Sequence, residues 1–127
     1  MRVVTERGLR GLLERHVELF NAAVSSGDYD PFLATFAEDA VMRFDDLPVG
    51  PFVGRGAIAE AYATQPPSDT MALIGMQEVG ADAVTAAFEW DAGGTGCMYL
   101  RFRDARPGEG ALDGGAEVVE LAIAFTT

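Results

Sequence analysis

The chain has 127 residues, of which 20 are acidic and nine are Lys or Arg, so its formal net charge at pH 7 is −11. This length fits one domain, and a hydrophobic content of 49% is typical of a chain that folds around a core. The acidic excess argues against binding to nucleic acid or to an anionic membrane, because both attract clustered Lys and Arg. One Cys excludes an internal disulfide, and together with a single His it argues against a zinc site.

No apolar run reaches the length of a membrane span, and residues 1–7 lack the apolar stretch of a signal peptide. We therefore expect one soluble, cytoplasmic domain over residues 1–127. The segment Gly54-Arg55-Gly56 follows a proline-containing loop and lacks the third glycine of a dinucleotide-binding motif. We expect neither a cofactor nor a metal.

The first third of the chain is predicted to be helical. Apolar side chains recur every three or four positions over residues 6–25, which indicates an amphipathic helix, and Gly27 follows its end. Asp30 followed by Pro31 is typical of a helix start and predicts a short second helix. After residue 39 the period changes to two, which predicts a strand with one apolar face formed by Ala40, Met42 and Phe44.

The remainder is predicted to be a loop, a helix and a meander of strands. Two prolines and a glycine make residues 47–51 a loop, and residues 57–64 form a third helix that ends before Pro66. Four strands follow, separated by turn signals, near residues 71–79, 83–91, 97–104 and 117–126. Strands joined by short turns pair antiparallel, so the predicted fold class is α+β.

One face of the predicted sheet is too apolar for three modest helices to cover. Alternation assigns to this face Val84, Ala86, Phe88, Trp90, Met98, Leu100, Phe102, Val119, Leu121, Ile123 and Phe125. Two interpretations remain open. Either these side chains fill a solid core, or a strongly curved sheet encloses a cavity lined by aromatic and methionine side chains.

The order of elements and four local segments resemble a known family. The segments are Gly27-Asp28 beyond Phe20, the run 36–40, the run 46–51 before Gly54, and the helix 57–62. Together they resemble the NTF2-like superfamily, in particular its ketosteroid isomerase and SnoaL-like branch. The resemblance implies a cone-shaped fold, three helices on a curved and mostly antiparallel sheet, and usually a homodimer. It does not imply one chemistry, because members include isomerases, polyketide cyclases, dehydratases, epoxide hydrolases and non-enzymatic binding modules.

The resemblance implies a carboxylate base at the end of the first strand, because the isomerases place one there. That position falls on Asp45 or Asp46. Counting back from Tyr62 selects Asp45, whereas strand alternation selects Asp46, which shares a face with Met42 and Phe44. We favour Asp46, because the base must point into the pocket; a bulge at the strand end would reverse the choice. The alternative is that both are solvated strand-end carboxylates.

The oxyanion donors of the isomerases are a tyrosine and a protonated aspartic acid. The resemblance places these positions at Phe20 and Met98, neither of which donates a hydrogen bond. Tyr62 matches a supporting tyrosine. His16 lies on the apolar face of the first helix and could face Asp46 across the pocket. The two side chains would then form an acid–base pair. The alternative is that His16 has no catalytic role and makes its hydrogen bonds to backbone groups or to water.

The sequence thus predicts a SnoaL-like or isomerase-like pocket protein. The predicted chemistry is cofactor-independent acid–base catalysis (isomerisation, cyclisation or dehydration) on a small hydrophobic polycyclic or polyketide-like substrate. Asp46, or Asp45, is the candidate base, and His16 or Tyr62 the candidate donor. Alternatives are non-catalytic binding of an apolar ligand and an assembly module whose outward sheet face forms a dimer. The predicted pocket residues are Phe20, Met42, Phe44, Phe88, Trp90, Met98, Leu100 and Leu121.

Overall fold

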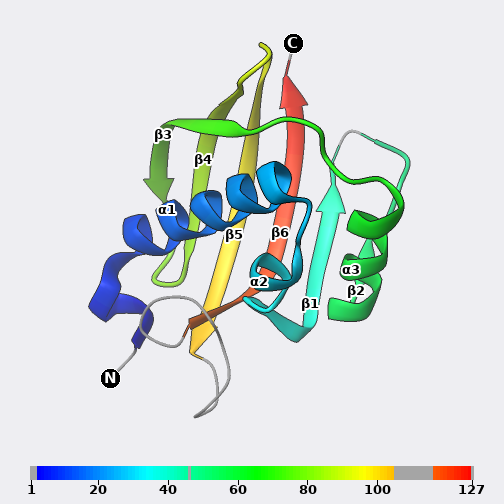
Figure 1. Ribbon diagram of the computed structural model, residues 1–127. Coiled ribbons are helices and arrows are strands. Elements are labelled where there is room, and N and C mark those ends of the chain that lie inside the picture. The colour runs from blue at the N-terminus through cyan, green and yellow to red at the C-terminus, as the bar shows by residue number, and fades with distance from the viewer. Residues whose placement is uncertain (1–2, 46, 105–115, 127) are drawn as a thin grey trace.

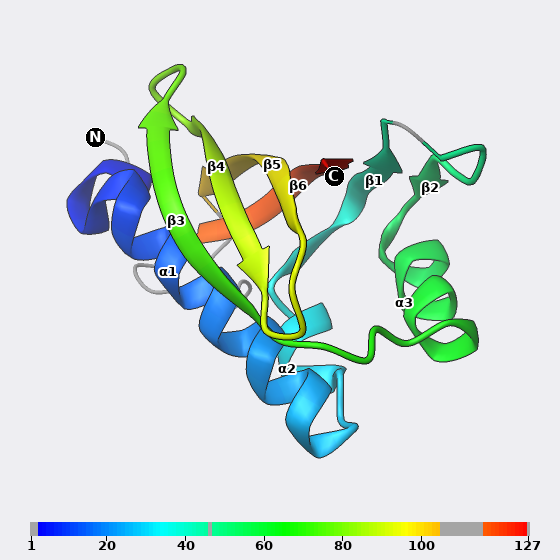
Figure 2. The same cartoon turned by 90° about the horizontal axis from the view of Figure 1, so that it is seen from above.

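The computed structural model describes residues 3–45, 47–104 and 116–126, in which three helices lie against one curled six-stranded sheet (Figures 1 and 2). In chain order the elements are α1 (Val3–Ser26), α2 (Asp30–Leu33), β1 (Phe36–Phe44), β2 (Phe52–Val53), α3 (Arg55–Thr64), β3 (Met71–Glu78), β4 (Ala83–Trp90), β5 (Thr95–Asp104) and β6 (Ala116–Thr126). The α+β class and the curved sheet are therefore confirmed. The predicted helices and strands are present, with bounds that differ by a few residues.

The strands follow the order β2-β1-β6-β5-β4-β3. Every neighbouring pair is antiparallel except β1 and β6, which run parallel. Neither this parallel pair nor the short strand β2 was foreseen from the sequence. Parallel pairing joins the first long strand to the last, so the two halves of the chain form one sheet.

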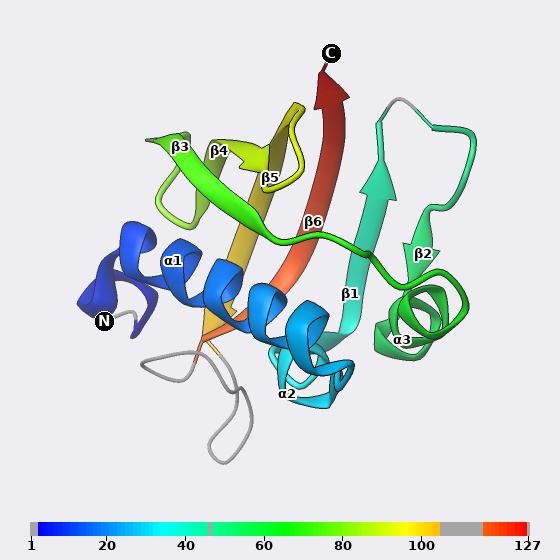
Figure 3. The same ribbon diagram turned by 45° about the horizontal axis from the view of Figure 1, so that its top comes forward.

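The long helix α1 lies across the concave face of the sheet, whereas α3 lies at the β1–β2 edge (Figures 2 and 3). The side chains of α1 at three- and four-residue spacing, such as Leu9, Leu12 and Leu13, are buried. Gly8 interrupts the helix with φ 76°, a left-handed conformation that glycine adopts without steric cost. The continuous amphipathic part therefore begins after Gly8.

A side-chain amide attaches α1 to the outer strand β3. Asn21 Nδ2 donates to the carbonyl of Met71 at 2.8 Å, and Asn21 Oδ1 accepts from the backbone N–H of Met71 at 2.9 Å. The amide thereby pairs with both backbone groups of one residue, as a neighbouring strand would. Each such partly buried hydrogen bond is worth about 1 kcal/mol. The pair fixes where β3 begins relative to α1.

The inner sheet face is built from cross-strand rows. One row pairs Phe88 with Gly96 and Gly96 with Phe125. The ring of Phe88 lies over Gly96, since a Cβ at residue 96 would come within 2.5 Å of Phe88 Cζ and 2.8 Å of the Ala124 carbonyl oxygen. Only glycine therefore leaves room for the Phe88 ring over residue 96.

The inward face of β6 differs in part from the prediction. The register shifts at residues 101–102, so that Leu121 pairs with Leu100 and Val118 pairs with Phe102. A bulge therefore brings Val118, rather than Val119, onto the face of Leu121. Simple alternation cannot reveal such a bulge.

The outer sheet face carries ion pairs. Arg43 pairs with Glu120 and Asp45, and Arg103 pairs with Glu117 and Asp39. Hydrogen bonds from Arg43 lower the pKa of the Glu120 carboxyl below its usual value. These charges lie on the side of the sheet away from α1, as the predicted alternation requires.

Substituting Gly96→Ala should lower the free energy of unfolding by about 1–3 kcal/mol, because the added methyl group meets the Phe88 ring and the Ala124 carbonyl. Gly75→Ala is the matched control, since nothing lies within 4 Å of a Cβ there. We expect the control to change stability by less than about 0.5 kcal/mol. Urea denaturation of both variants measures the difference, and equal midpoints would contradict the proposed close approach.

Candidate functional site

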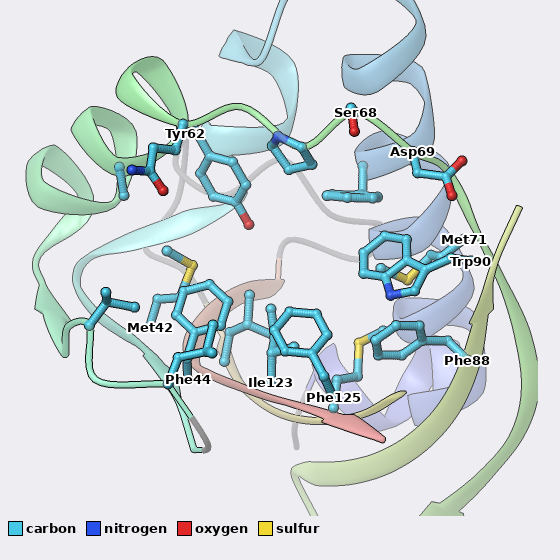
Figure 4. Close-up of a pocket in the computed structure, with 18 of the residues that line it drawn as sticks. Met42, Phe44, Tyr62, Ser68, Asp69, Met71, Phe88, Trp90, Ile123 and Phe125 are labelled. Atoms are coloured by element: carbon cyan, nitrogen blue, oxygen red, sulfur yellow. The ribbon is translucent and has the colours of Figure 1, made fainter. Parts of the chain in front are cut away.

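A cavity of about 660 Å³ lies between the concave sheet face and the helices (Figure 4). The inner faces of β1, β4, β5 and β6 form its floor, and α1, α2 and α3 contribute its walls. The cavity is lined by His16, Phe20, Phe32, Met42, Phe44, Leu47, Val49, Phe52, Ala61, Tyr62, Thr64, Gln65, Pro67, Ser68, Asp69, Met71, Phe88, Trp90, Gly93, Met98, Leu121, Ile123 and Phe125. Of the two interpretations of the apolar face, the structure therefore favours a cavity over a solid core.

The segment that joins α3 to β3 crosses the open face of the sheet (Figures 1 and 3). Pro67, Ser68 and Asp69 in this segment line the cavity. From the sequence, the prolines here were interpreted only as a helix stop. Two adjacent prolines also favour an extended chain, which is the conformation needed to cross the sheet. Sequence reasoning missed this role of the segment.

Aromatic rings make a continuous apolar surface along the floor. Phe125 stacks on Phe44 with centroids 6.2 Å apart and on Trp90 at 6.3 Å. Trp90 also contacts Phe88 at 5.1 Å and Phe20 at 6.3 Å. Such a surface suits a flat, largely apolar molecule.

His16 is a polar group in this apolar wall. It is 4% exposed, and its ring contacts Phe32 at 5.1 Å and Phe36 at 6.1 Å. The Nδ1 atom is buried without a hydrogen-bond partner among the described residues. Burial lowers the pKa of His16 to about 4, so the imidazole is neutral at pH 7.

Tyr62 projects from α3, and its hydroxyl points into the cavity (Figure 4). Its ring stacks on Tyr29 at 5.3 Å, and the Tyr29 hydroxyl donates to the Pro67 carbonyl at 3.3 Å. Burial, followed by the nearby Tyr29, raises the pKa of Tyr62, so its hydroxyl keeps its proton. The ring of Phe32 contacts both Tyr62, at 5.5 Å, and His16.

Among the described residues, no carboxylate of the first strand or its end lines the cavity. Asp45 is exposed, and its Oδ1 accepts from Arg43 Nε at 3.1 Å on the outer side. Asp46, the favoured base, lies outside the described residues. A different carboxylate, Asp69, lines the cavity and was missed by sequence reasoning. Its oxygens accept from the backbone N–H groups of Thr70 at 3.0 Å and Ala92 at 2.8 Å.

The predicted pocket residues come together with one exception. Phe20, Met42, Phe44, Phe88, Trp90, Met98 and Leu121 line the cavity, as do His16 and Tyr62. Leu100 is fully buried in the core and does not line it. The two positions where the resemblance implies oxyanion donors, Phe20 and Met98, present apolar side chains to the cavity.

Comparison with known proteins assigns the family. The sequence profile of the SnoaL-like domain matches residues 17–125. The chain belongs to the SnoaL-like family. The match covers the cavity floor and most of its walls, with His16 just outside it, and the NTF2-like fold expected from the resemblance is confirmed. No curated protein matches this SnoaL-like chain.

Solved structures share the fold at low sequence identity. A protein from Catenulispora acidiphila in complex with S-DNPA is 17% identical, with a TM-score of 0.64 and 92% of each chain covered. A ketosteroid isomerase-like protein from Erwinia carotovora atroseptica is 14% identical, with a TM-score of 0.63 and coverage of 97% of this chain and 98% of that one. An NTF2-like protein with a cystatin-like fold from Novosphingobium aromaticivorans is 17% identical, with a TM-score of 0.60 and coverage of 91% and 80%.

The part of the chain that the structure describes holds neither a membrane-spanning helix nor a metal-binding cluster. None of its helices combines the length and the apolar character that a membrane crossing demands. Within the same residues, no group of three or more His, Cys, Asp or Glu side chains is arranged to hold a metal ion.

The buried His16 should make folding stability depend on pH. The unfolded histidine takes up a proton below its ordinary pKa of 6.5, whereas the folded one resists protonation down to about 4. Stability is therefore full above pH 6.5, and it falls by about 3 kcal/mol as the pH drops to about 4. The chain has one His, so the loss between pH 6.5 and about 5, above the range in which carboxyl groups ordinarily titrate, reports on His16.

Urea denaturation between pH 7 and pH 4.5 measures this loss, with His16→Leu as the comparison. The variant should show a much flatter profile, because leucine does not titrate. Parallel profiles for the two proteins would show that His16 is not buried in its neutral form.

Proposed function

We propose that this SnoaL-like protein binds a small, largely apolar polycyclic or polyketide-like molecule in the cavity. We further propose that it acts on this molecule by cofactor-independent acid–base chemistry, as an isomerase, cyclase or dehydratase. The observation that carries the proposal is that His16 lines an aromatic cavity and that its buried Nδ1 has no hydrogen-bond partner among the described residues. Leaving a buried polar atom unpaired costs about 1–3 kcal/mol, and a bound ligand would recover this cost.

Two exposed apolar side chains support ligand binding. Leu47 is 45% exposed and Val49 is 48% exposed, and both line the cavity. An apolar ligand would cover them, gaining about 25 cal/mol for each Å² removed from water. The aromatic floor adds a flat surface for the same ligand.

The chemistry follows from the states of His16 and Tyr62. Neutral His16 has one ring nitrogen with a free lone pair that can act as a base, and protonated Tyr62 offers a hydrogen bond to a ligand carbonyl. A carbonyl held by Tyr62 makes the adjacent C–H more acidic. His16 would take that proton and return it to another carbon of the same molecule. Asp46 remains a proposed carboxylate base at the end of β1.

A non-catalytic binding protein is the second candidate. The specific observation in its favour is that Phe20 and Met98 present apolar groups where the isomerases have oxyanion donors. Such a site would bind a carbonyl compound with little stabilisation of developing negative charge.

We also propose that a second copy packs on the outer sheet face. Small side chains form a row there, because Ala87 pairs with Cys97 and Cys97 pairs with Ala124. A row of small side chains leaves this part of the face flat enough for another sheet. Measurement of the molecular mass in solution tests this proposal: a dimer is expected, and a monomer at every concentration would contradict it.

Exchange of solvent deuterium into 2-tetralone tests the acid–base proposal without knowledge of the natural substrate. The protein should accelerate exchange at the carbons next to the carbonyl, as followed by NMR. His16→Leu and Tyr62→Phe should each reduce the acceleration about 100-fold. Tyr99→Phe is the matched control, since Tyr99 pairs with Thr85 and Ala122 outside the cavity lining.

The outcome separates the two candidates. Exchange that depends on His16 and Tyr62 supports the enzyme. Binding of 2-tetralone without accelerated exchange would contradict the acid–base proposal and favour the binding protein.

A further inference from the structure

The described lining of the cavity includes an acidic side chain but no arginine. Among the described residues that line it, Asp69 carries the one carboxyl group, the imidazole of His16 is neutral, and the Tyr62 hydroxyl keeps its proton. No described arginine lines the cavity. The arginines whose side chains are described are all engaged elsewhere, each with a carboxylate: Arg10, Arg15, Arg43, Arg55, Arg101 and Arg103.

Asp69 is held in a fixed position. One carboxylate oxygen accepts from the Thr70 N–H at 3.0 Å and the other from the Ala92 N–H at 2.8 Å. The bond from Ala92 joins the segment before β3 to the turn after β4, and a backbone bond from the Asp91 N–H to the Thr70 carbonyl at 2.9 Å links the same two segments. A carboxylate has about four lone-pair sites, so capacity remains for a further donor.

The carboxylate lies next to an aromatic surface. Met71, two residues after Asp69, pairs with Trp90 across the strands, and Figure 4 shows Asp69 and Trp90 adjacent at one end of the cavity. The Trp90 ring contacts Phe20 and stacks on Phe125, both at 6.3 Å. A carboxylate beside tryptophan is a favourable environment for an organic cation, because the charge and the ring face both attract it.

We infer that the ligand of this cavity is an apolar molecule carrying one protonated amine, with the amine at Asp69 and Trp90 and the apolar body on the aromatic floor. This inference rests on the proposal that the cavity binds a small apolar molecule, and it adds the charge of that molecule. An anionic group is disfavoured, since it would enter an apolar cavity without a described cation to pair with. The net charge of −11 also repels anions and attracts cations at long range.

Three probes with one scaffold test the inference at pH 7: 2-naphthylmethylamine, 2-naphthylmethanol and 2-naphthoate, which are a cation, a neutral molecule and an anion. Calorimetric titration of the unaltered protein should rank them in that order. We expect about a tenfold change in affinity at each step. Raising the salt concentration should weaken binding of the amine more than binding of the alcohol.

Two variants test whether the preference for the amine depends on Asp69. Asp69→Asn should reduce the preference for the amine over the alcohol to within about twofold. Glu89→Gln is the matched control: it removes the same charge from an exposed residue of the neighbouring strand that does not line the cavity. The control should keep the preference. Because Asp69 also supports the backbone, thermal denaturation of each variant accompanies the titrations.

Each outcome has a separate meaning. If the alcohol fails to bind, the proposed ligand-binding function is overturned. If the alcohol binds at least as tightly as the amine, the amine inference is overturned while the binding proposal stands. This comparison uses the unaltered protein, so it decides the question even if Asp69→Asn does not fold. An equal loss of preference in Glu89→Gln would show that the amine responds to overall charge rather than to Asp69.

Discussion

The side-chain amide of Asn21 fixes the geometry on which the cavity depends. By pairing with both backbone groups of Met71, it ties the C-terminal part of α1 to the first residue of β3. The outermost strand on that side therefore begins at the helix. Asp69, two residues earlier, bonds to Ala92 and ties the same region to the turn after β4. These contacts hold the cavity wall in place with hydrogen bonds rather than with side chains that would fill the space.

The unfilled space follows from a mismatch between the helices and the sheet. The helix α1 covers one part of the concave face, and α3 lies at the opposite edge (Figures 2 and 3). Phe44 and Phe125 stack on each other in the uncovered part, and Trp90 joins Phe125 on one side to Phe20 of α1 on the other. The cavity is therefore a consequence of the sheet curvature, and its apolar walls favour occupation by an apolar ligand.

Much of this arrangement follows from periodicity in the sequence. Alternation assigned Met42, Phe88 and Met98 to the inner face, and helical spacing placed His16 and Phe20 on the face of α1 that meets the sheet. Those signals are local, since each depends on neighbouring positions in one element. The same signals did not separate a solid core from a cavity, because both need the same apolar face.

Long-range features could not be predicted in this way. The parallel pairing of β1 with β6 joins segments far apart in the chain, and the bulge that brings Val118 inward has no marker in the residue pattern. Asp69 was missed because it lies in a segment without periodicity, and its partner Ala92 is 23 residues away. The choice between Asp45 and Asp46 depended on the strand end, where Asp45 turns outward to Arg43.

The central claim is that the aromatic cavity is a binding site rather than a packing defect. Methionine methyl groups report on it directly, because Met42, Met71 and Met98 line the cavity while Met76 packs elsewhere against the core. With 13C-methyl methionine, addition of 2-naphthylmethanol should shift the NMR signals of Met42, Met71 and Met98 and leave that of Met76 in place. Unchanged signals for the three cavity methionines at saturating probe would contradict the claim.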